Sequence, residues 1–285
     1  MTTQAKAFRD LLNKREPFIA ADVYSALTGK IVEMVGFKAA YLGGAACSAF
    51  HYAVPDYGMF SQVEQIEQAQ RIADVINIPL VADADTLGET VAEAYHFTRR
   101  YARAGIAAIH VEDQVNPKHS VFANGLTSIA DMQARIEACA KARKDSDIVI
   151  IARCDEFYDT GGRKIEEAYK RGKAYVEAGA DALVFPTVPV ETGTELAKQI
   201  PVPFTVLGEN FPGAVCHLHT GWGAMGAAKL HLTFARELFE TGALNVNSTR
   251  LSRADGQGQL LEHDLYDELI ADWAKKTGRP IRPKP

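Results

Sequence analysis

Acidic residues stand at the ends of three consecutive apolar runs in this sequence. The first run ends in Asp83 and Asp85, the second in Glu112, and the third in Arg153 and Asp155. Carboxylate oxygens together with water are the ligands that Mg²⁺ prefers, and Mn²⁺ accepts the same donors. Two acids spaced two residues apart share one face of a strand. The pattern predicts a divalent metal site formed by Asp83, Asp85 and Glu112, although Asp also caps helices and could serve only that purpose here.

Short apolar runs that alternate with helical patterns must position these acids. Helical spacing of apolar residues is clear at Gln62–Ile76 and Val91–Ala104. No G-x-G-x-x-G motif follows the first apolar run, which disfavours a doubly wound dinucleotide fold. We therefore predict a (β/α)8 TIM-type barrel, in which the ends of the strands carry the chemistry. Its strands are expected at Phe18–Val23, Ala39–Leu42, Leu80–Ala84, Ala107–Val111, Ile148–Ala152, Ala182–Phe185 and Pro203–Leu207, with Val215–Leu218 as the candidate for the eighth.

The end of the sequence carries more helix than a barrel needs. Helices are predicted from about Ala227 to Phe239 and from Gly258 to Lys275. We expect one barrel domain over residues 1–285, with 240–285 as a helical extension. The last helix presents an apolar stripe, which predicts that it packs on another subunit of a homo-oligomer. This stripe consists of Leu261, Leu265, Leu269 and Trp273.

A run of small residues follows the second predicted strand. Tyr41 and Leu42 are followed by Gly43, Gly44 and Ala45. Small residues let a ligand approach the backbone closely, and successive N–H groups can bind a carboxylate. A simple turn is the ordinary alternative for two adjacent glycines.

Composition and charge exclude several classes of function. The net charge is −5 and the basic residues are scattered, so we expect no nucleic-acid partner. No apolar run approaches 18 residues and the polar N-terminal segment lacks a signal sequence, so we expect a cytoplasmic protein without a membrane partner. The predicted strands present no lysine for Schiff-base chemistry, and the carboxylate set argues against a catalytically inactive binding protein.

Several motifs, taken together and in order, resemble the phosphoenolpyruvate mutase/isocitrate lyase superfamily. The resemblance runs from about residue 18 to residue 205 and fades after Leu207. Each motif alone is weak, but the set at these spacings is specific. The motifs are YLGGAA, VPDYG, DADTLGE, AGIAAIHVEDQVNPK, IARCD and AYVEAGADALVFP.

The resemblance implies a modified barrel, often a tetramer with its last helices swapped between subunits, that binds Mg²⁺ and a 2-oxo or 2-hydroxy acid. Its members work through an enolate or a similar intermediate. By the resemblance, Asp85 would hold the metal, with Asp83 and Glu112 acting directly or through water. The other implied roles are a substrate carboxylate bound by Gly43, Gly44 and Ala45, an oxyanion or carboxylate bound by Arg153, Tyr41 as base, and Asp56 near the substrate.

The chain departs from the family on the loop after the fourth predicted strand. The lyases carry a cysteine there as the acid, whereas this chain reads Lys118-His119-Ser120, and a glutamate of the lyases is replaced by Thr187. Lys118, His119 and Ser120 are therefore the catalytic candidates on this loop. His119 is the candidate for proton delivery, because histidine as a residue type titrates near neutral pH.

The strand-end motifs favour the lyases over the other branches of the superfamily. We predict cleavage of a C–C bond in a small 2-hydroxy or 2-oxo (di)carboxylate through an enolate. Phosphonopyruvate hydrolase, phosphoenolpyruvate mutase or oxaloacetate decarboxylase-like chemistry are the alternatives, and the lysine on the loop fits the phosphonate branch.

Overall fold

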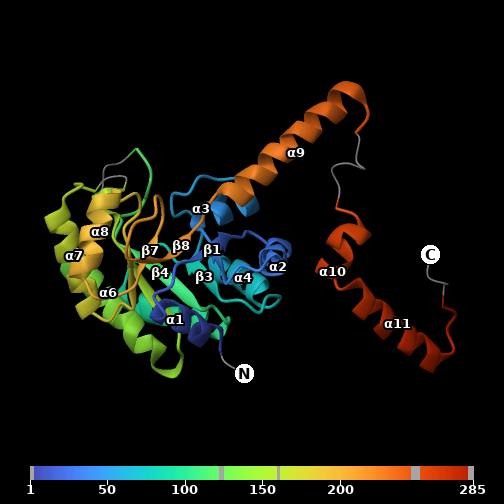
Figure 1. Ribbon diagram of the computed structural model, residues 1–285, viewed down its shortest axis with the longest axis horizontal. Coiled ribbons are helices and arrows are strands. Elements are labelled where there is room, and N and C mark those ends of the chain that lie inside the picture. The colour runs from blue at the N-terminus through green and yellow to red at the C-terminus, as the bar shows by residue number, and fades with distance from the viewer. Residues whose placement is uncertain (1–2, 122–124, 159–160, 245–250, 282–285) are drawn as a thin grey trace. The chain divides into compact units, whose positions relative to one another are not determined.

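Eight parallel strands close into a barrel in which each strand pairs with the next along the chain (Figure 1). The computed structural model describes residues 3–121, 125–158, 161–244 and 251–281. Strand β8 pairs with β1, with Phe18 opposite Cys216, so the sheet has no open edge. All eight predicted strands are confirmed within one or two residues. They are β1 (Phe18–Asp22), β2 (Ala39–Leu42), β3 (Leu80–Asp83), β4 (Ala108–Glu112), β5 (Val149–Arg153), β6 (Ala182–Val184), β7 (Phe204–Val206) and β8 (Ala214–Leu218).

From β1 to β7, helices connect consecutive strands and cover the outside of the barrel (Figure 1). Ser61 and Thr90 begin α4 and α5 through capping boxes with Glu64 and Glu93, which satisfies N–H groups that the helix leaves unpaired. The helices are α1 (Gln4–Asn13), α2 (Ala26–Val35), α3 (Gly44–Cys47), α4 (Gln62–Ala73), α5 (Val91–Arg103), α6 (Ile129–Ala142), α7 (Ile165–Glu177), α8 (Val190–Gln199), α9 (Trp222–Thr241), α10 (Gly258–Leu260) and α11 (His263–Thr277).

The core has an outer layer between strands and helices and an inner layer inside the barrel. Helix α1 completes the inner layer, because its Phe8 is fully buried edge-on against Phe18 with 6.0 Å between ring centroids. Arg9 fastens the same helix through an ion pair of 2.7 Å with Asp181. Helix α1 therefore closes the end of the barrel where the strands begin, and the opposite end remains for a site.

Two expectations about the end of the chain are wrong in detail. Helix α9 begins at Trp222 rather than Ala227, because Asp22 at the end of β1 accepts a hydrogen bond of 2.9 Å from the Gly223 N–H and caps the helix. The single helix predicted from Gly258 is instead α10 and α11, because Glu262 takes a left-handed conformation with φ of 54° between them.

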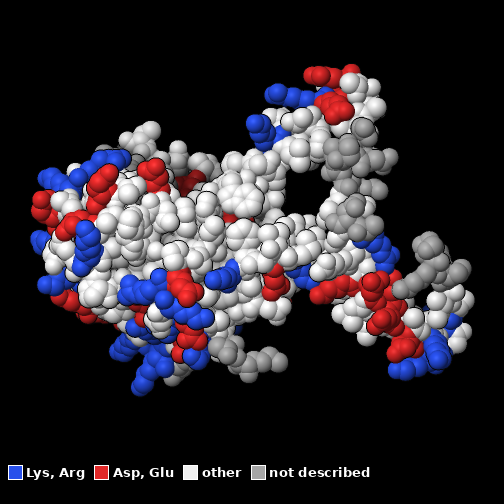
Figure 2. All heavy atoms as spheres, in the orientation of Figure 1, with Lys and Arg blue, Asp and Glu red and all other residues white. Residues whose placement is uncertain are grey.

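The chain divides into two compact units, residues 1–229 with the barrel and residues 230–285. Parts of the predicted extension 240–285 lie outside the described residues. None of the described helices is long and apolar enough to cross a lipid bilayer. On the face shown in Figure 2, basic and acidic side chains are interspersed over the barrel rather than gathered by sign.

Truncation of Phe8 tests whether α1 is part of the core. We expect Phe8→Ala to lower the free energy of unfolding by about 3–5 kcal/mol, because it leaves a cavity beside Phe18. Val35→Ala is the control, since Val35 is 65% exposed and a surface substitution changes stability by about 0.5 kcal/mol or less. Urea denaturation followed by circular dichroism measures both variants, and equal effects would show that α1 does not complete the core.

Candidate active site

A cavity of about 240 Å³ lies at the end of the barrel where the strands finish. Its wall comes from the segments that follow several different strands, as in barrel enzymes generally. Most residues predicted for a site line it, whereas Ser120 is not among its lining residues. The predicted residues in the wall are Tyr41, Gly43, Gly44, Ala45, Asp56, Asp83, His119 and Arg153.

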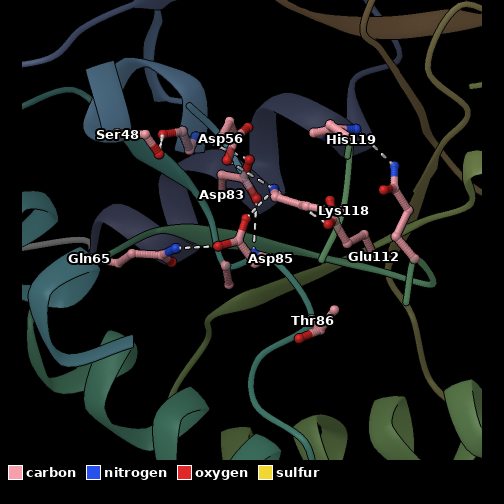
Figure 3. A network of polar contacts seen from close by, with 12 residues as sticks. Ser48, Asp56, Gln65, Asp83, Asp85, Thr86, Glu112, Lys118 and His119 are labelled. Carbon is pink, nitrogen blue, oxygen red and sulfur yellow. Dashed lines mark hydrogen bonds and ion pairs between the residues drawn. The ribbon is translucent and has the colours of Figure 1, made fainter. Parts of the chain in front are cut away.

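Three buried carboxyl groups meet beside this cavity (Figure 3). Asp83, Asp85 and Glu112 each offer an oxygen, and these oxygens lie within 4.8 Å of one another. The expectation that Asp83 and Asp85 share a strand face is wrong, because β3 ends at Asp83 and Asp85 takes a left-handed φ of 47°. The Asp85 N–H donates to Asp83 Oδ1 at 2.9 Å, and the Asp85 carbonyl accepts from the Glu112 N–H at 3.0 Å. A tight turn, rather than the strand, brings the acids together.

The ammonium group of Lys118 lies among these carboxylates (Figure 3). Its Nζ contacts Asp85 Oδ1 and lies 3.4 Å from both Asp56 Oδ1 and Glu112 Oε1. Burial by itself lowers the pKa of this lysine, but the surrounding carboxylates, Asp85 first, hold its pKa well above the usual value. Lys118 is therefore a fixed positive charge inside the cluster.

Glu112 shows that the cluster suits a divalent cation. Burial raises the pKa of Glu112 to about 8, although Arg153 Nη1 lies 2.9 Å from its Oε2 and opposes the shift. Among the described residues, neither of its buried carboxylate oxygens has a hydrogen bond of good geometry. Asp56, Asp83, Asp85, Glu112 and Asp155 outnumber Lys118 and Arg153, their cationic partners in the described part of the chain. A divalent ion would satisfy the Glu112 oxygens and offset most of this excess of negative charge.

A pair of polar side chains inside the barrel joins this cluster to the cavity. Tyr41 Oη lies 2.8 Å from His110 Nε2, and His110 Nδ1 faces Asp83 Oδ1 at 3.5 Å. Burial lowers the pKa of His110 to about 4, so its ring is neutral at neutral pH. A neutral ring that carries its proton on Nδ1 accepts a hydrogen bond at Nε2 from the Tyr41 hydroxyl group. Sequence reasoning missed His110, although it stands two residues before Glu112 on the same strand.

A hydrogen-bonded chain fixes Arg153 at the cavity wall. Arg153 Nε and Nη2 bind the two oxygens of Asp155 at 2.7 and 2.9 Å. The Asp155 N–H donates to Asp113 Oδ1 at 2.9 Å, and Asp113 Oδ2 accepts from the Tyr175 hydroxyl at 2.6 Å. Asp113 and Asp155 belong to the motifs AGIAAIHVEDQVNPK and IARCD, but the sequence did not predict that they hold Arg153 in place.

The glycine segment after β2 supports an acid as well as the cavity. The Gly44 N–H donates to Asp83 Oδ2 at 3.1 Å. A Cβ atom at Gly44 would lie 3.0 Å from that oxygen and 3.2 Å from Asp85 Oδ1. A side chain here would push the carboxylate oxygens aside by a few tenths of an ångström, so glycine suits the close approach of the backbone.

The loop after β4 brings some of its candidates to the cavity. His119 lines it, and its ring lies edge-on to Tyr158 with 5.1 Å between centroids. Ser120 Oγ instead donates to the Pro117 carbonyl at 2.8 Å. Thr187 lines the cavity and donates to the Phe157 carbonyl at 2.7 Å.

Comparison with known proteins supports a functional interpretation of this geometry. The family model described as phosphoenolpyruvate phosphomutase matches residues 8–230. The isocitrate lyase of Haloferax volcanii is 34% identical over 188 residues, which cover 65% of this chain and 54% of the relative. The 2,3-dimethylmalate lyase of Eubacterium barkeri is 36% identical over 202 residues, which cover 70% of this chain and 68% of the relative.

A solved structure extends the similarity to almost the whole chain. Phosphonopyruvate hydrolase, crystallised with oxalate and Mg²⁺, superposes with a TM-score of 0.82 at 25% identity. The match covers 94% of this chain and 98% of that chain. By sequence, the chain spans only about half of the isocitrate lyase and about two thirds of the dimethylmalate lyase.

The raised pKa of Glu112 predicts how cation binding depends on pH. A cation displaces the proton from Glu112, so affinity for Mn²⁺ should rise with pH, by up to about tenfold per pH unit, and level off near pH 8. Calorimetric titration at about pH 6, 7 and 8 measures this. Glu112→Gln should bind more weakly and lose this slope, and a wild-type affinity that stays flat across the range would contradict the role of Glu112.

Proposed function

Since the chain belongs to the phosphoenolpyruvate phosphomutase family, we propose that it is a Mg²⁺-dependent lyase that cleaves a C–C bond of a small 2-hydroxy or 2-oxo (di)carboxylate through an enolate. The observation that carries the proposal is one cavity lined by Tyr41, Asp83 and Arg153, through which the buried carboxylate cluster and the hydrogen bond from Tyr41 to His110 adjoin the substrate space. Carbon–carbon lyases among the relatives support this choice of reaction.

Asp83, Asp85 and Glu112 are the residues that would hold the cation. All their donors are oxygens, which suits Mg²⁺, with Mn²⁺ as the alternative. When bound, the ion supplies positive charge that stabilises a developing enolate. Arg153 binds a substrate carboxylate or an oxyanion, because its guanidinium is fixed in the cavity wall by Asp155.

Cleavage of a 2-hydroxy acid needs a base for the hydroxyl proton. Tyr41 lines the cavity, and burial holds its pKa well above the usual value, so it carries its proton at neutral pH. The positive charges of Arg153 and Lys118 oppose this shift and favour the deprotonated form, in which Tyr41 accepts the hydroxyl proton of the substrate. The neutral His110 orients the Tyr41 oxygen through its hydrogen bond of 2.8 Å. His110 acts through Tyr41 and has Asp83 behind it.

Cleavage also needs an acid that protonates the carbanion released when the bond breaks. His119 lines the cavity, whereas the Ser120 hydroxyl is engaged with Pro117 and Lys118 is held by the carboxylates. We assign the acid to His119. Asp56 and the Gly43–Ala45 segment complete the substrate site.

Phosphonopyruvate hydrolysis is the second candidate. It rests on the lysine of the loop, Lys118, and on the fold shared with phosphonopyruvate hydrolase over almost the whole chain. A decarboxylase of oxaloacetate type would use the same cluster and the same enolate. These reactions differ in substrate rather than in the residues that hold the metal.

A substrate panel with Mg²⁺ tests the proposed function. We expect a 2-oxo acid to be released from at least one malate-type substrate, with activity lost in excess chelator. Asp85→Ala should lower kcat/KM by at least about 10³-fold, because the ion stabilises the enolate charge. Coupled reduction of the 2-oxo acid measures turnover. Full activity in chelator would contradict the metal, and turnover of phosphonopyruvate alone would favour the second candidate.

The role of His119 is tested separately from metal binding. We expect His119→Gln to lower kcat by about 10²-fold or more, because a general acid contributes about that much, while Mn²⁺ affinity stays unchanged. Ser120→Ala is the matched control and should keep most of the activity. If the serine variant loses as much as the histidine variant, His119 is not the acid.

We also propose that the protein is a cytoplasmic homo-oligomer, a tetramer as the resemblance implies, with residues 240–285 as the extension that mediates assembly. Leu265, Leu269 and Trp273 on α11 are between 51% and 58% exposed, which is unusual for large apolar side chains in one stripe. A groove of about 430 Å³ lined by Ile19, Phe37 and other apolar residues gives the barrel a surface for contact.

Light scattering at micromolar concentration tests this assembly. We expect the mass of a tetramer for the wild type and a smaller mass for the double variant Leu265→Asp, Leu269→Asp, because charges on the stripe oppose its burial. Asp264→Asn on the same helix is the control for a change of charge away from the stripe, since the Asp264 side chain is 88% exposed. A monomeric wild type would contradict the proposal.

A further inference from the structure

A buried glutamine outside the predicted site contacts one of the carboxylates. Gln65 on α4 is 2% exposed, and its Nε2 donates to Asp85 Oδ2 (Figure 3). Asp85 Oδ1, the other oxygen, faces the cluster, where it contacts Lys118 Nζ. The two oxygens of Asp85 therefore have different partners. Oδ2 faces the neutral amide of Gln65, and Oδ1 faces the carboxylate cluster.

The Asp85 carboxylate determines which end of the Gln65 amide faces it, and Tyr101 on α5 holds the other end. The Tyr101 hydroxyl is fully buried and donates to Gln65 Oε1 at 3.0 Å. Because a carboxylate at neutral pH only accepts, and the amide oxygen only accepts, the arrangement is consistent only with Nε2 toward Asp85. The hydrogen bonds are therefore donated in one direction, from Tyr101 to Gln65 and from Gln65 to Asp85.

A second glutamine on the same helix offers a comparison. Gln62 lies one turn before Gln65, and its Nε2 donates to the Ala84 carbonyl at 2.9 Å. Its Oε1 also lies 3.2 Å from the Tyr101 hydroxyl. Gln62 therefore shares the helix, the tyrosine partner and the loop with Gln65, but it touches backbone rather than the carboxylate.

We propose that Gln65, oriented by Tyr101, is a positioning residue that fixes the Asp85 carboxylate for a divalent cation. The inference rests on the proposed metal site. Hydrogen bonds to Asp83 and Glu112 hold the Asp85 backbone beyond the end of β3. Gln65 is the donor that fixes Oδ2 of the Asp85 carboxylate. Because the Gln65 amide is neutral, it fixes the carboxylate without cancelling its negative charge. A lysine or arginine in its place would cancel that charge. Partners of this kind set the orientation of metal ligands and strongly affect affinity.

Binding of Mn²⁺ to purified variants tests the proposal without relying on turnover. We expect Gln65→Met, which keeps the length of the side chain and removes the donor, to weaken Mn²⁺ binding by about 10-fold or more. Tyr101→Phe, which removes one oxygen atom, should weaken it in the same direction by a smaller factor. Gln62→Met is the matched control and should stay within about twofold of the wild type. Electron paramagnetic resonance of free Mn²⁺ measures affinity, and circular dichroism checks folding.

The outcomes separate this inference from the proposed metal site. Unchanged Mn²⁺ affinity in Gln65→Met would overturn the positioning role while leaving the metal site in place. Equal weakening in Gln62→Met would also overturn it, because the effect would then come from packing of α4. A wild type that binds no Mn²⁺ would overturn both. If Gln65→Met does not fold, Tyr101→Phe decides, and an unchanged affinity in that variant overturns the role.

Discussion

Burial of more negative than positive charge at one rim of the barrel is the constraint on which the site depends. Asp83, Asp85 and Glu112 are buried, and each offers an oxygen that lies within 4.8 Å of the others. Removing carboxylates from water is costly unless charges and hydrogen bonds compensate. Lys118 and Arg153 compensate in part. Burial of its carboxyl group explains why Glu112 holds its proton more tightly than a solvated glutamate, and the remaining excess of negative charge explains why a divalent cation suits this position.

The barrel supplies the rigidity that such a cluster needs. Repelling groups stay together only where the surrounding backbone and side chains fix them. On one side the Gly44 N–H and the turn at Asp85 hold the acids of β3. On the other side the chain from Tyr175 through Asp113 and Asp155 holds Arg153. Both supports come from segments that immediately follow strands, so closure of the barrel sets the distance between the two walls of the cavity.

The fold was predictable because strands buried on both faces leave continuous apolar runs, and all eight strands lie where such runs were found. The acids of the site were predictable because they end those runs, although a turn rather than a shared face joins Asp83 to Asp85. Supporting residues carry no such signal. Gln65 looks like an ordinary polar residue of an amphipathic helix, and His110 is hidden inside a strand. The start of α9 depended on Asp22, a cap more than 200 residues away in sequence.

The cavity is lined by charged and by uncharged residues, and this division separates chemistry from recognition. The charged groups Asp83 and Arg153, with Tyr41, suit the carboxylate and the adjacent oxygen of a substrate. The neutral wall, as we call Thr187 and Leu207 together with Pro186 and Gly208, carries no charge. Thr187 stands where the lyases of the resemblance place a glutamate, so the wall that differs is the neutral one. A change there alters which substituent fits without disturbing the charge balance around the acids.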